Sequence, residues 1–182
     1  AIIDVLGADA VTLNPYLGPD AVEPFLARTD AFLYLLCRTS NPSAAALQDL
    51  AVEADVAAGH PHEPFHLRVA RIAATWGPAE RLGFVVGATA TAQLEAARAA
   101  VPDRAFLIPG IGAQGGDVAS AVAVGPAQAG TVAARPGGGL VVNVSRAIAG
   151  AWKAVPGGPG TDPATAIRAA AAEWAARIAV LM

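Results

Sequence analysis

The sequence predicts an α/β protein built on a parallel β-sheet, and three observations support this. Of the 182 residues, 54% are hydrophobic and 15% are charged, a balance typical of strands that are buried on both faces. Five short apolar runs occur along the chain, and alanine-rich segments of helical character separate them. Segments rich in Gly, Pro and polar residues follow the runs. Strands that alternate with helices in this way indicate a parallel sheet.

The five apolar runs are the predicted strands. They lie at residues 10–14, 31–37, 83–88, 105–109 and 139–144. A chain of this length can bury one substantial core but is short for two, so we expect a single domain over residues 1–182. The Gly/Pro-rich stretches at residues 135–139 and 155–160 are too short for interdomain linkers, and we expect them to be loops inside that domain.

Two helix starts are marked by a capping residue that is followed by proline. Asn41 precedes Pro42, and Asp162 precedes Pro163 at the start of the closing helix. In the closing helix, apolar residues recur three or four positions apart: Ile167, Ala171, Trp174, Ile178 and Leu181. This spacing predicts an apolar stripe, which we expect to lie on the sheet.

Charge and composition argue against several classes of protein. The formal net charge is -3 and Lys153 is the single lysine, so the chain has no basic stripe for nucleic acid or an anionic membrane. The apolar runs are far shorter than the roughly 20 residues that span a bilayer, so no membrane partner is expected. A single cysteine, Cys37, excludes internal disulfide bonds and fits a reducing compartment. We therefore expect a cytoplasmic protein.

A glycine-rich loop follows the fourth predicted strand. Gly110, Gly112 and Gly115 have the spacing G-x-G-x-x-G, which is found in dinucleotide-binding loops. Such a site also needs an acidic residue about 20 positions further on, whereas the acidic residue after Asp117 is Asp162. The loop is therefore better suited to a phosphate monoester, which backbone N–H groups can hold. A tight turn without a ligand remains an alternative at this point.

A second polar segment follows the fifth predicted strand. Ser145 and Arg146 come directly after that apolar run, and the carboxyl ends of parallel strands lie at one edge of a sheet. A guanidinium there can hold a phosphate through two hydrogen bonds. In barrels of alternating strands and helices, phosphate commonly binds between the loops after the last two strands. An exposed surface charge is the alternative for Arg146.

Five segments of the chain, taken together, resemble one enzyme family. Residues 8–26, 35–50, 82–89, 106–117 and 141–148 follow the order of segments in the orotidine 5'-monophosphate decarboxylases, and in particular of the bacterial branch called type 2. The resemblance implies a homodimeric (β/α)₈ barrel, of which this chain covers about the last five units. It also implies conversion of orotidine monophosphate to uridine monophosphate and carbon dioxide, without a metal or an organic cofactor.

The resemblance further assigns residues to the binding of a nucleoside monophosphate. The phosphate-binding set that it implies is Gly112, Gln114, Gly115, Gly116, Ser145 and Arg146. The set that it implies for the pyrimidine is Thr39, Ser40 and Pro109. Binding energy from a remote phosphate can hold the pyrimidine in a strained, desolvated position, so Gln114 and Arg146 are expected to affect turnover although they lie away from the reacting carbon.

The family's catalytic motif is absent from these 182 residues. That motif, Asp-x-Lys-x-x-Asp, supplies carboxylates against the substrate carboxylate and an ammonium group for the carbanion. The only lysine, Lys153, follows the last predicted strand and is expected to be an ordinary solvated side chain. We therefore assign no catalytic residue in this chain. Because it opens on apolar residues without Met, we expect an N-terminal portion to precede Ala1, with a natural or engineered partial barrel as the alternative.

Two other functions remain open from the sequence. One is another phosphate-binding β/α-barrel enzyme, a decarboxylase or an isomerase, and the other is a phosphate-binding module without catalysis. The histidines His60, His62 and His66 have spacing that a metal ion could use, but flanking prolines favour a surface loop that enters a helix, and we expect no metal. Cys37 is expected to be a buried thiol rather than a nucleophile. Asn14 and Tyr16 fit either a pocket or a turn.

Overall fold

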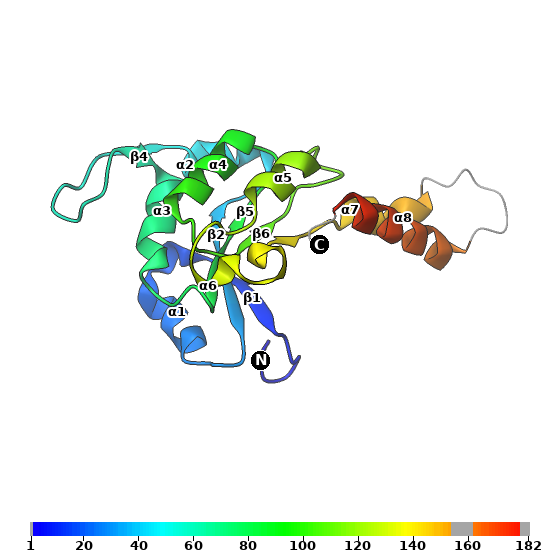
Figure 1. Ribbon diagram of the computed structural model, residues 1–182, viewed down its shortest axis with the longest axis horizontal. Helices are drawn as coiled ribbons and strands as arrows, with labels where there is room; N and C mark the ends of the chain where they lie inside the picture. The colour runs from blue at the N-terminus through cyan, green and yellow to red at the C-terminus, as the bar shows by residue number, and fades with distance from the viewer. Residues whose placement is uncertain (1, 154–161, 179–182) are drawn as a thin grey trace.

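The computed structural model describes residues 2–153 and 162–178, and its centre is a five-stranded parallel sheet (Figure 1). The strands are β1 (Ala10–Leu13), β2 (Phe32–Arg38), β5 (Leu82–Val86), β6 (Phe106–Ile108) and β7 (Val141–Val142). They lie in the order β1-β2-β5-β6-β7, and every neighbouring pair is parallel. The five predicted strands are therefore confirmed, although β7 is much shorter than the run that predicted it.

Helices and short 3₁₀ turns connect the strands. The segment after β1 contains η1 (Pro15–Leu17) and α1 (Pro19–Leu26), and the segment after β2 contains η2 (Pro42–Ala44), α2 (Ala45–Gln48) and α3 (Phe65–Ala74). Later in the chain come α4 (Thr91–Ala100), α5 (Val118–Val124), α6 (Gly130–Ala133), η3 (Pro136–Gly139), α7 (Arg146–Ala149), η4 (Ala151–Lys153) and α8 (Pro163–Arg177). Helices α3, α4 and α5 pack in succession beside the sheet (Figure 1).

A two-stranded hairpin interrupts the segment between α2 and α3. Its strands, β3 (Ala51–Val52) and β4 (Glu63–Pro64), are antiparallel, and the intervening residues project from the body of the protein (Figure 1). Glu63 is buried and accepts hydrogen bonds from Arg68 and Arg71 on α3. These ion pairs attach the base of the hairpin to α3.

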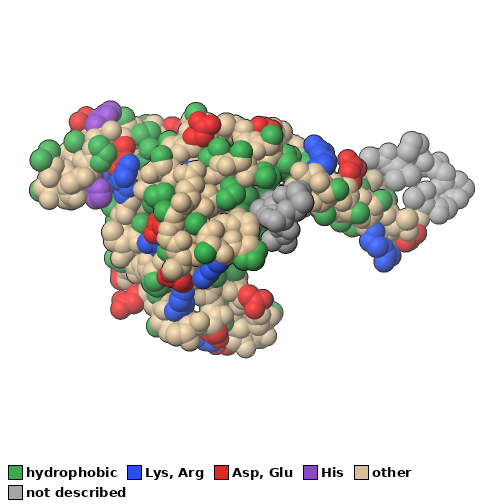
Figure 2. All heavy atoms as spheres, viewed as in Figure 1, with side chains coloured by type: hydrophobic (Ala, Val, Ile, Leu, Met, Phe, Trp, Pro, Cys, Tyr) green, Lys and Arg blue, Asp and Glu red, His purple; other side chains and the backbone are tan. Residues whose placement is uncertain are grey.

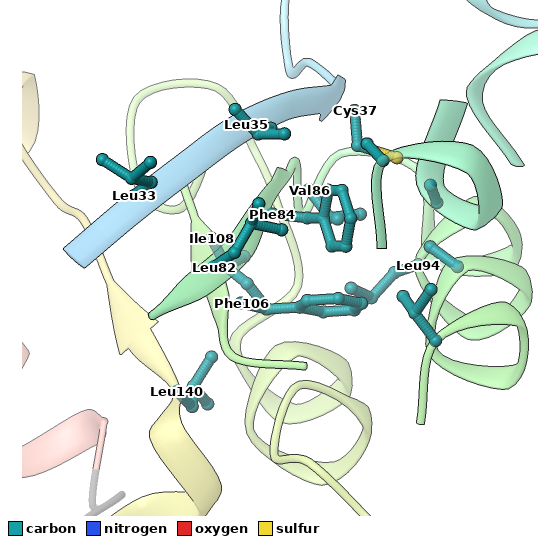
Figure 3. Close-up of a cluster of buried hydrophobic side chains, with 14 of the residues drawn as sticks. Leu33, Leu35, Cys37, Leu82, Phe84, Val86, Leu94, Phe106, Ile108 and Leu140 are labelled. Carbon is teal, nitrogen blue, oxygen red and sulfur yellow. The ribbon is translucent and has the colours of Figure 1, made fainter. Parts of the chain in front are cut away.

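Alternate residues of β2 enter two different hydrophobic clusters. Leu33 and Leu35 pack in the larger cluster with Leu94 of α4 (Figure 3). Tyr34 lies between them in sequence and packs in the second cluster with Val132 of α6. Successive side chains of a strand point to opposite faces, so both faces of β2 are covered. This accounts for the nearly continuous apolar sequence of the strand.

The closing helix begins where the sequence predicts but does not lie on the sheet. Asp162 caps α8 by accepting hydrogen bonds from the backbone N–H groups of Ala164 and Thr165. The predicted stripe is the half-buried face of the helix as far as Ile178, and Leu181 lies outside the described residues. The helix packs on α7 and η4 and extends away from the sheet (Figure 1). The prediction was wrong because these two short elements follow β7 directly and cover the stripe.

Two smaller predictions had different outcomes. Asn41 occupies the cap position before Pro42, but its amide donates to Ser43 Oγ, and its side-chain oxygen accepts from the Thr39 hydroxyl instead of capping the helix. Residues 136–139 form η3 within the fold, whereas residues 155–160 lie outside the described ranges. Within the ranges that are described, each helix is too short or too polar to cross a membrane.

Candidate functional site

A small pocket lies at the carboxyl ends of β6 and β7. It has a volume of about 140 Å³ and is lined by Pro109, Gly110, Ile111, Ala113, Gln114, Asn143, Ser145 and Arg146. Four of these residues, Pro109, Gln114, Ser145 and Arg146, belong to the set that the sequence singles out. The fold thus brings the glycine-rich loop and the segment after the last strand to one place. Among the described residues that line the pocket, Arg146 is the one charged side chain and none is a carboxylate.

The glycine-rich loop is closed by its own backbone. The N–H of Gly115 donates to the carbonyl of Gly112, and the N–H of Gly116 donates to the carbonyl of Gly110, each at 2.9 Å. Asp117 then caps α5 by accepting from the backbone N–H groups of Ala119 and Ser120. Hydrogen bonds from Ser120 and these N–H groups lower the pKa of Asp117. The carboxylate is therefore engaged by its own helix.

Ser40 joins the loop after β2 to the glycine-rich loop. Its hydroxyl donates to Gln114 Oε1 at 3.1 Å, and Gln114 Nε2 donates to the carbonyl of Ser40 at 3.3 Å. Two glycines make room for this approach, since a β-carbon at Gly87 would lie 2.8 Å from Cα of Ser40 and one at Gly110 would lie 2.8 Å from its Cβ. Ser40 is therefore held within a few ångströms of the pocket without lining it.

Thr39 precedes Ser40 and does not line the pocket. Its backbone N–H donates to Gln48 Oε1 at 2.8 Å, and its hydroxyl accepts from Gln48 Nε2 at 2.8 Å. The same hydroxyl is 2.6 Å from Asn41 Oδ1, to which it donates. Within the described structure, all its side-chain hydrogen bonds are thus made to the segment between β2 and the end of α2.

Arg146 is the first residue of α7, and its side chain is exposed. Among the described residues, no hydrogen bond or ion pair engages its guanidinium, which leaves all its donors free for an anion. Beside it, the hydroxyl of Ser145 donates to Asn143 Oδ1 at 2.9 Å. Asn143 is a pocket residue that the sequence reasoning missed, although a polar residue in the last apolar run is a signal that could have found it.

A second cavity, of about 610 Å³, lies between η1 and α3. Asn14 and Tyr16 line this larger cavity rather than the small pocket, and the side chain of Asn14 also accepts a hydrogen bond from the backbone N–H of Tyr16. These residues therefore line a cavity and also form a turn, the two alternatives that the sequence left open. The cavity is not the pocket beside the glycine-rich loop.

The histidines, Cys37 and Lys153 lie away from the small pocket. His62 is exposed on the projecting hairpin, where Figure 2 shows histidine side chains, and the chain then enters α3, as predicted. His66 lies on α3 and is buried, which the prediction did not include. The described residues contain no cluster of three or more metal-ligating side chains.

Cys37 is buried as predicted, and burial raises the pKa of its thiol to about 12. Lys153 is exposed and lies 5.5 Å from the ring of Trp152.

Comparison with known proteins identifies the family. Residues 1–155 match the model of a family described as "Orotidine 5'-phosphate decarboxylase / HUMPS family". The chain belongs to this family. It is 47% identical over 141 residues to the orotidine 5'-phosphate decarboxylase of Halorubrum lacusprofundi, a match that covers 78% of this chain and 48% of that protein. It is 46% identical over 165 residues to that of Azoarcus sp. strain BH72, covering 90% and 53%.

Solved structures of the orotidine 5'-phosphate decarboxylase family have the same fold. Leishmania donovani UMP synthase matches with a TM-score of 0.70 and 33% identity, over 96% of this chain and 34% of that chain. Leishmania donovani OMP decarboxylase matches with a TM-score of 0.69 and 30% identity, over 97% and 60%. The five-stranded sheet is therefore a half-barrel of the (β/α)₈ fold, as predicted. The chain spans about half the length of the curated relatives it matches.

Proposed function

We propose that this chain holds the nucleotide in an orotidine 5'-monophosphate decarboxylase, which converts orotidine monophosphate to uridine monophosphate and carbon dioxide. Membership of the family supports the reaction. The observation that carries the binding role is the pocket in which Gln114 and Arg146, from two different loops, face one small volume. The substrate of the site is accordingly a nucleoside monophosphate.

The size and charge of the pocket favour a phosphate group. A volume of about 140 Å³ is well below the ~300 Å³ at which pockets begin to enclose whole drug-sized ligands. In this proposal the phosphate takes the pocket, and the sugar and base extend from it along the edge of the sheet. Arg146 supplies the charge, and Ser145 and Gln114 supply hydrogen bonds. Gly112, Gly115 and Gly116 do not line the pocket, and the N–H groups of Gly115 and Gly116 already donate within the loop, so in this proposal these glycines shape the loop around the phosphate.

The pyrimidine is proposed to lie on the side of Ser40 and Thr39, with Pro109 in the wall below the base. The Ser40 hydroxyl donates a hydrogen bond to Gln114. In this proposal Ser40 contacts the base and Gln114 contacts the phosphate, so the two contacts come from side chains that are hydrogen-bonded to each other. Binding energy from the phosphate can then contribute to holding the base in a strained and desolvated position. In this proposal the phosphate contacts therefore affect the reaction rate, although the reacting carbon lies at the other end of the nucleotide.

The acid–base chemistry requires groups that these 182 residues do not offer at the pocket. The sequence has one lysine, and it lies in η4, exposed. We propose that the lysine and carboxylates of the reaction come from polypeptide outside this sequence and that the assembled enzyme is a cytoplasmic homodimer. No metal ion or organic cofactor enters the proposed mechanism.

The test compares binding with turnover. The 182-residue chain is titrated with uridine monophosphate, with uridine and with ribose 5-phosphate, and is then assayed for loss of orotidine monophosphate absorbance. We expect binding of uridine monophosphate in preference to the other two, without turnover. The chain is next joined to the part of the Azoarcus relative that it does not match, and this protein is expected to release uridine monophosphate. Absence of binding by the chain would contradict the proposed binding role, and a folded but inactive joined protein would contradict the proposed reaction.

A further inference from the structure

The turn that presents Ser40 to Gln114 is held from behind by side chains that do not reach the pocket. Thr39 has both of its backbone polar groups occupied by side chains. Its N–H donates to Gln48 Oε1 at 2.8 Å, and its carbonyl accepts from Arg38 Nη1 at 2.6 Å. Because Thr39 and Ser40 share a peptide bond, the position of Ser40 depends on these two contacts.

Asp49 anchors the side chain of Arg38. Its Oδ1 accepts from Arg38 Nε at 2.9 Å and its Oδ2 accepts from Arg38 Nη2 at 3.0 Å, so the carboxylate binds the guanidinium through two parallel hydrogen bonds. The Arg38 side chain is only 9% exposed, and that of Asp49 is 25% exposed. These bonds from Arg38 lower the pKa of Asp49. The planar pair fixes where the remaining Arg38 nitrogen points.

A third element holds the pair in place. Asp49 Oδ1 lies 3.3 Å from Nδ1 of His66, which is buried on α3. The same Nδ1 is 2.9 Å from the carbonyl of Gln48, and a carbonyl oxygen accepts, so Nδ1 donates there. His66 thereby holds the backbone carbonyl of Gln48 and the side-chain carboxylate of Asp49, which attaches the end of α2 to α3.

A second ion pair, between Arg68 on α3 and Glu63 on β4, serves as a comparison, because its contacts do not lead to the pocket. Arg68 donates to the buried Glu63 at 3.0 Å, much as Arg38 donates to Asp49. Its other donors reach the carbonyls of Glu53 and Pro61 in the projecting hairpin. Arg38 differs because its remaining donor reaches a carbonyl one residue before Ser40.

We propose that Arg38 and Asp49 are positioning residues, which set Ser40 for its contact with Gln114 through the backbone of Thr39. The inference rests on the proposed function, in which this edge of the half-barrel binds uridine monophosphate. Sites of this kind need their groups held to within about half an ångström, so a support behind the turn affects affinity without touching the ligand.

The first test measures affinity for uridine monophosphate in a set of variants. Asp49→Asn is expected to weaken binding about tenfold. Glu63→Gln, the matched control in the second ion pair, is expected to lower the melting temperature and leave binding unchanged. In a Gln114→Ala background, Asp49→Asn is expected to add no further loss, because the contact that it supports is already gone. Equal and independent losses in both backgrounds would overturn the inference.

Arg38→Lys provides a second variant, which also serves if Asp49→Asn does not fold. Lysine keeps the charge but cannot bind Asp49 and Thr39 as a planar fork does. It is therefore expected to weaken binding, and unchanged affinity in a folded Arg38→Lys protein would overturn the inference.

The second test needs no ligand. The chain is labelled with ¹⁵N and studied by NMR, and the side-chain amide signal of Gln114 is identified as the one that is lost in Gln114→Ala. We expect this signal to shift in Asp49→Asn and to stay in place in Glu63→Gln. If the unmodified chain binds no uridine monophosphate, the proposed function fails, while the amide comparison still decides the positioning role. An unshifted signal in Asp49→Asn would overturn it.

Discussion

The indole of Trp174 on α8 covers the face of the glycine-rich loop where Gly112 has no side chain. A β-carbon placed on Gly112 would lie 3.2 Å from Cζ2 of Trp174 and 3.0 Å from Cβ of Ala147 on α7. Trp174 also packs against the main hydrophobic core, and the guanidinium of Arg177 lies 4.1 Å from the centre of its ring. The closing helix thus contacts the candidate site through one aromatic residue.

The first prediction compares two glycines of this loop. Gly112 and Gly115 have φ values of +82° and +79°, so alanine is strained at either by about 1–2 kcal/mol. A β-carbon at Gly115 has nothing within 4 Å, whereas one at Gly112 meets Ala147 and Trp174. Gly112→Ala is therefore expected to lower the free energy of unfolding, measured in urea, by more than Gly115→Ala. Equal losses would show that the contact with Trp174 has no energetic effect.

The second prediction concerns the free guanidinium of Arg146. Arg146→Ala is expected to weaken binding of uridine monophosphate by roughly 10- to 100-fold, the loss of a charge-assisted pair of hydrogen bonds. Because the side chain is exposed and unpaired among the described residues, the melting temperature is expected to change little. Arg168→Ala, which removes an exposed arginine on α8, is the control and should leave binding intact. Calorimetric titration of both variants tests the assignment, which an unaltered Arg146→Ala affinity would contradict.

The third prediction concerns Cys37, the only cysteine. Its thiol is buried and donates to the carbonyl of His66 at 3.3 Å. Burial raises the pKa of the thiol from 9.0 to about 12, so at pH 8 the folded protein holds about a thousandfold less thiolate than an exposed cysteine of that starting value. Alkylation by iodoacetamide, followed by mass spectrometry, is expected to be far slower in the folded chain than in urea. Similar rates in both conditions would contradict this placement.

The fourth prediction is a dependence of stability on pH. The hydrogen bonds from Arg38 lower the pKa of Asp49 below 3.8 in the folded chain. The stabilisation from its carboxylate is therefore complete above the unfolded pKa and is lost as the pH falls through the lower, folded pKa. Asp49→Asn is expected to lower stability at pH 7 and to make the difference from the unmodified chain shrink below about pH 4. Urea unfolding at several pH values measures this, and a difference that stays constant with pH would exclude the carboxylate as its source.

The fifth prediction concerns Arg98, which is almost completely buried on α4. Its guanidinium donates to the carbonyls of Val101 and Arg104 at 3.0 and 2.8 Å and lies 3.7 Å from the ring centre of Phe106. Arg98→Met removes the guanidinium donor from these carbonyls and is expected to cost about 3 kcal/mol or more in the free energy of unfolding. Arg168→Met, at an exposed site, should cost little in the same urea measurement. Comparable costs would show that the carbonyls find other donors.

The strands and the glycine-rich loop could be predicted because their signals are local. An apolar run such as residues 31–37 is long enough for a strand and too short for most helices, and the alternation of such runs with helices implies parallel pairing. Parallel pairing in turn places the carboxyl ends of β6 and β7 together, so Gln114 and Arg146 were expected at one edge. The position of the closing helix could not be predicted in the same way, because its apolar stripe indicates which face of the helix is buried but not which other element covers that face.

By itself, the sequence determined which segments become the strands of the central sheet, which loops reach the same edge of that sheet and, through its resemblance, the family. These follow from the order of short patterns along the chain. Only the tertiary structure decided that Ser40 meets Gln114, that Arg38 and Asp49 lie behind that contact, and that α8 covers α7. The contact of Ser40 with Gln114 joins residues 74 positions apart and depends on close backbone approach at Gly87 and Gly110. No local pattern records that distance, because it is set by the packing of the whole half-barrel.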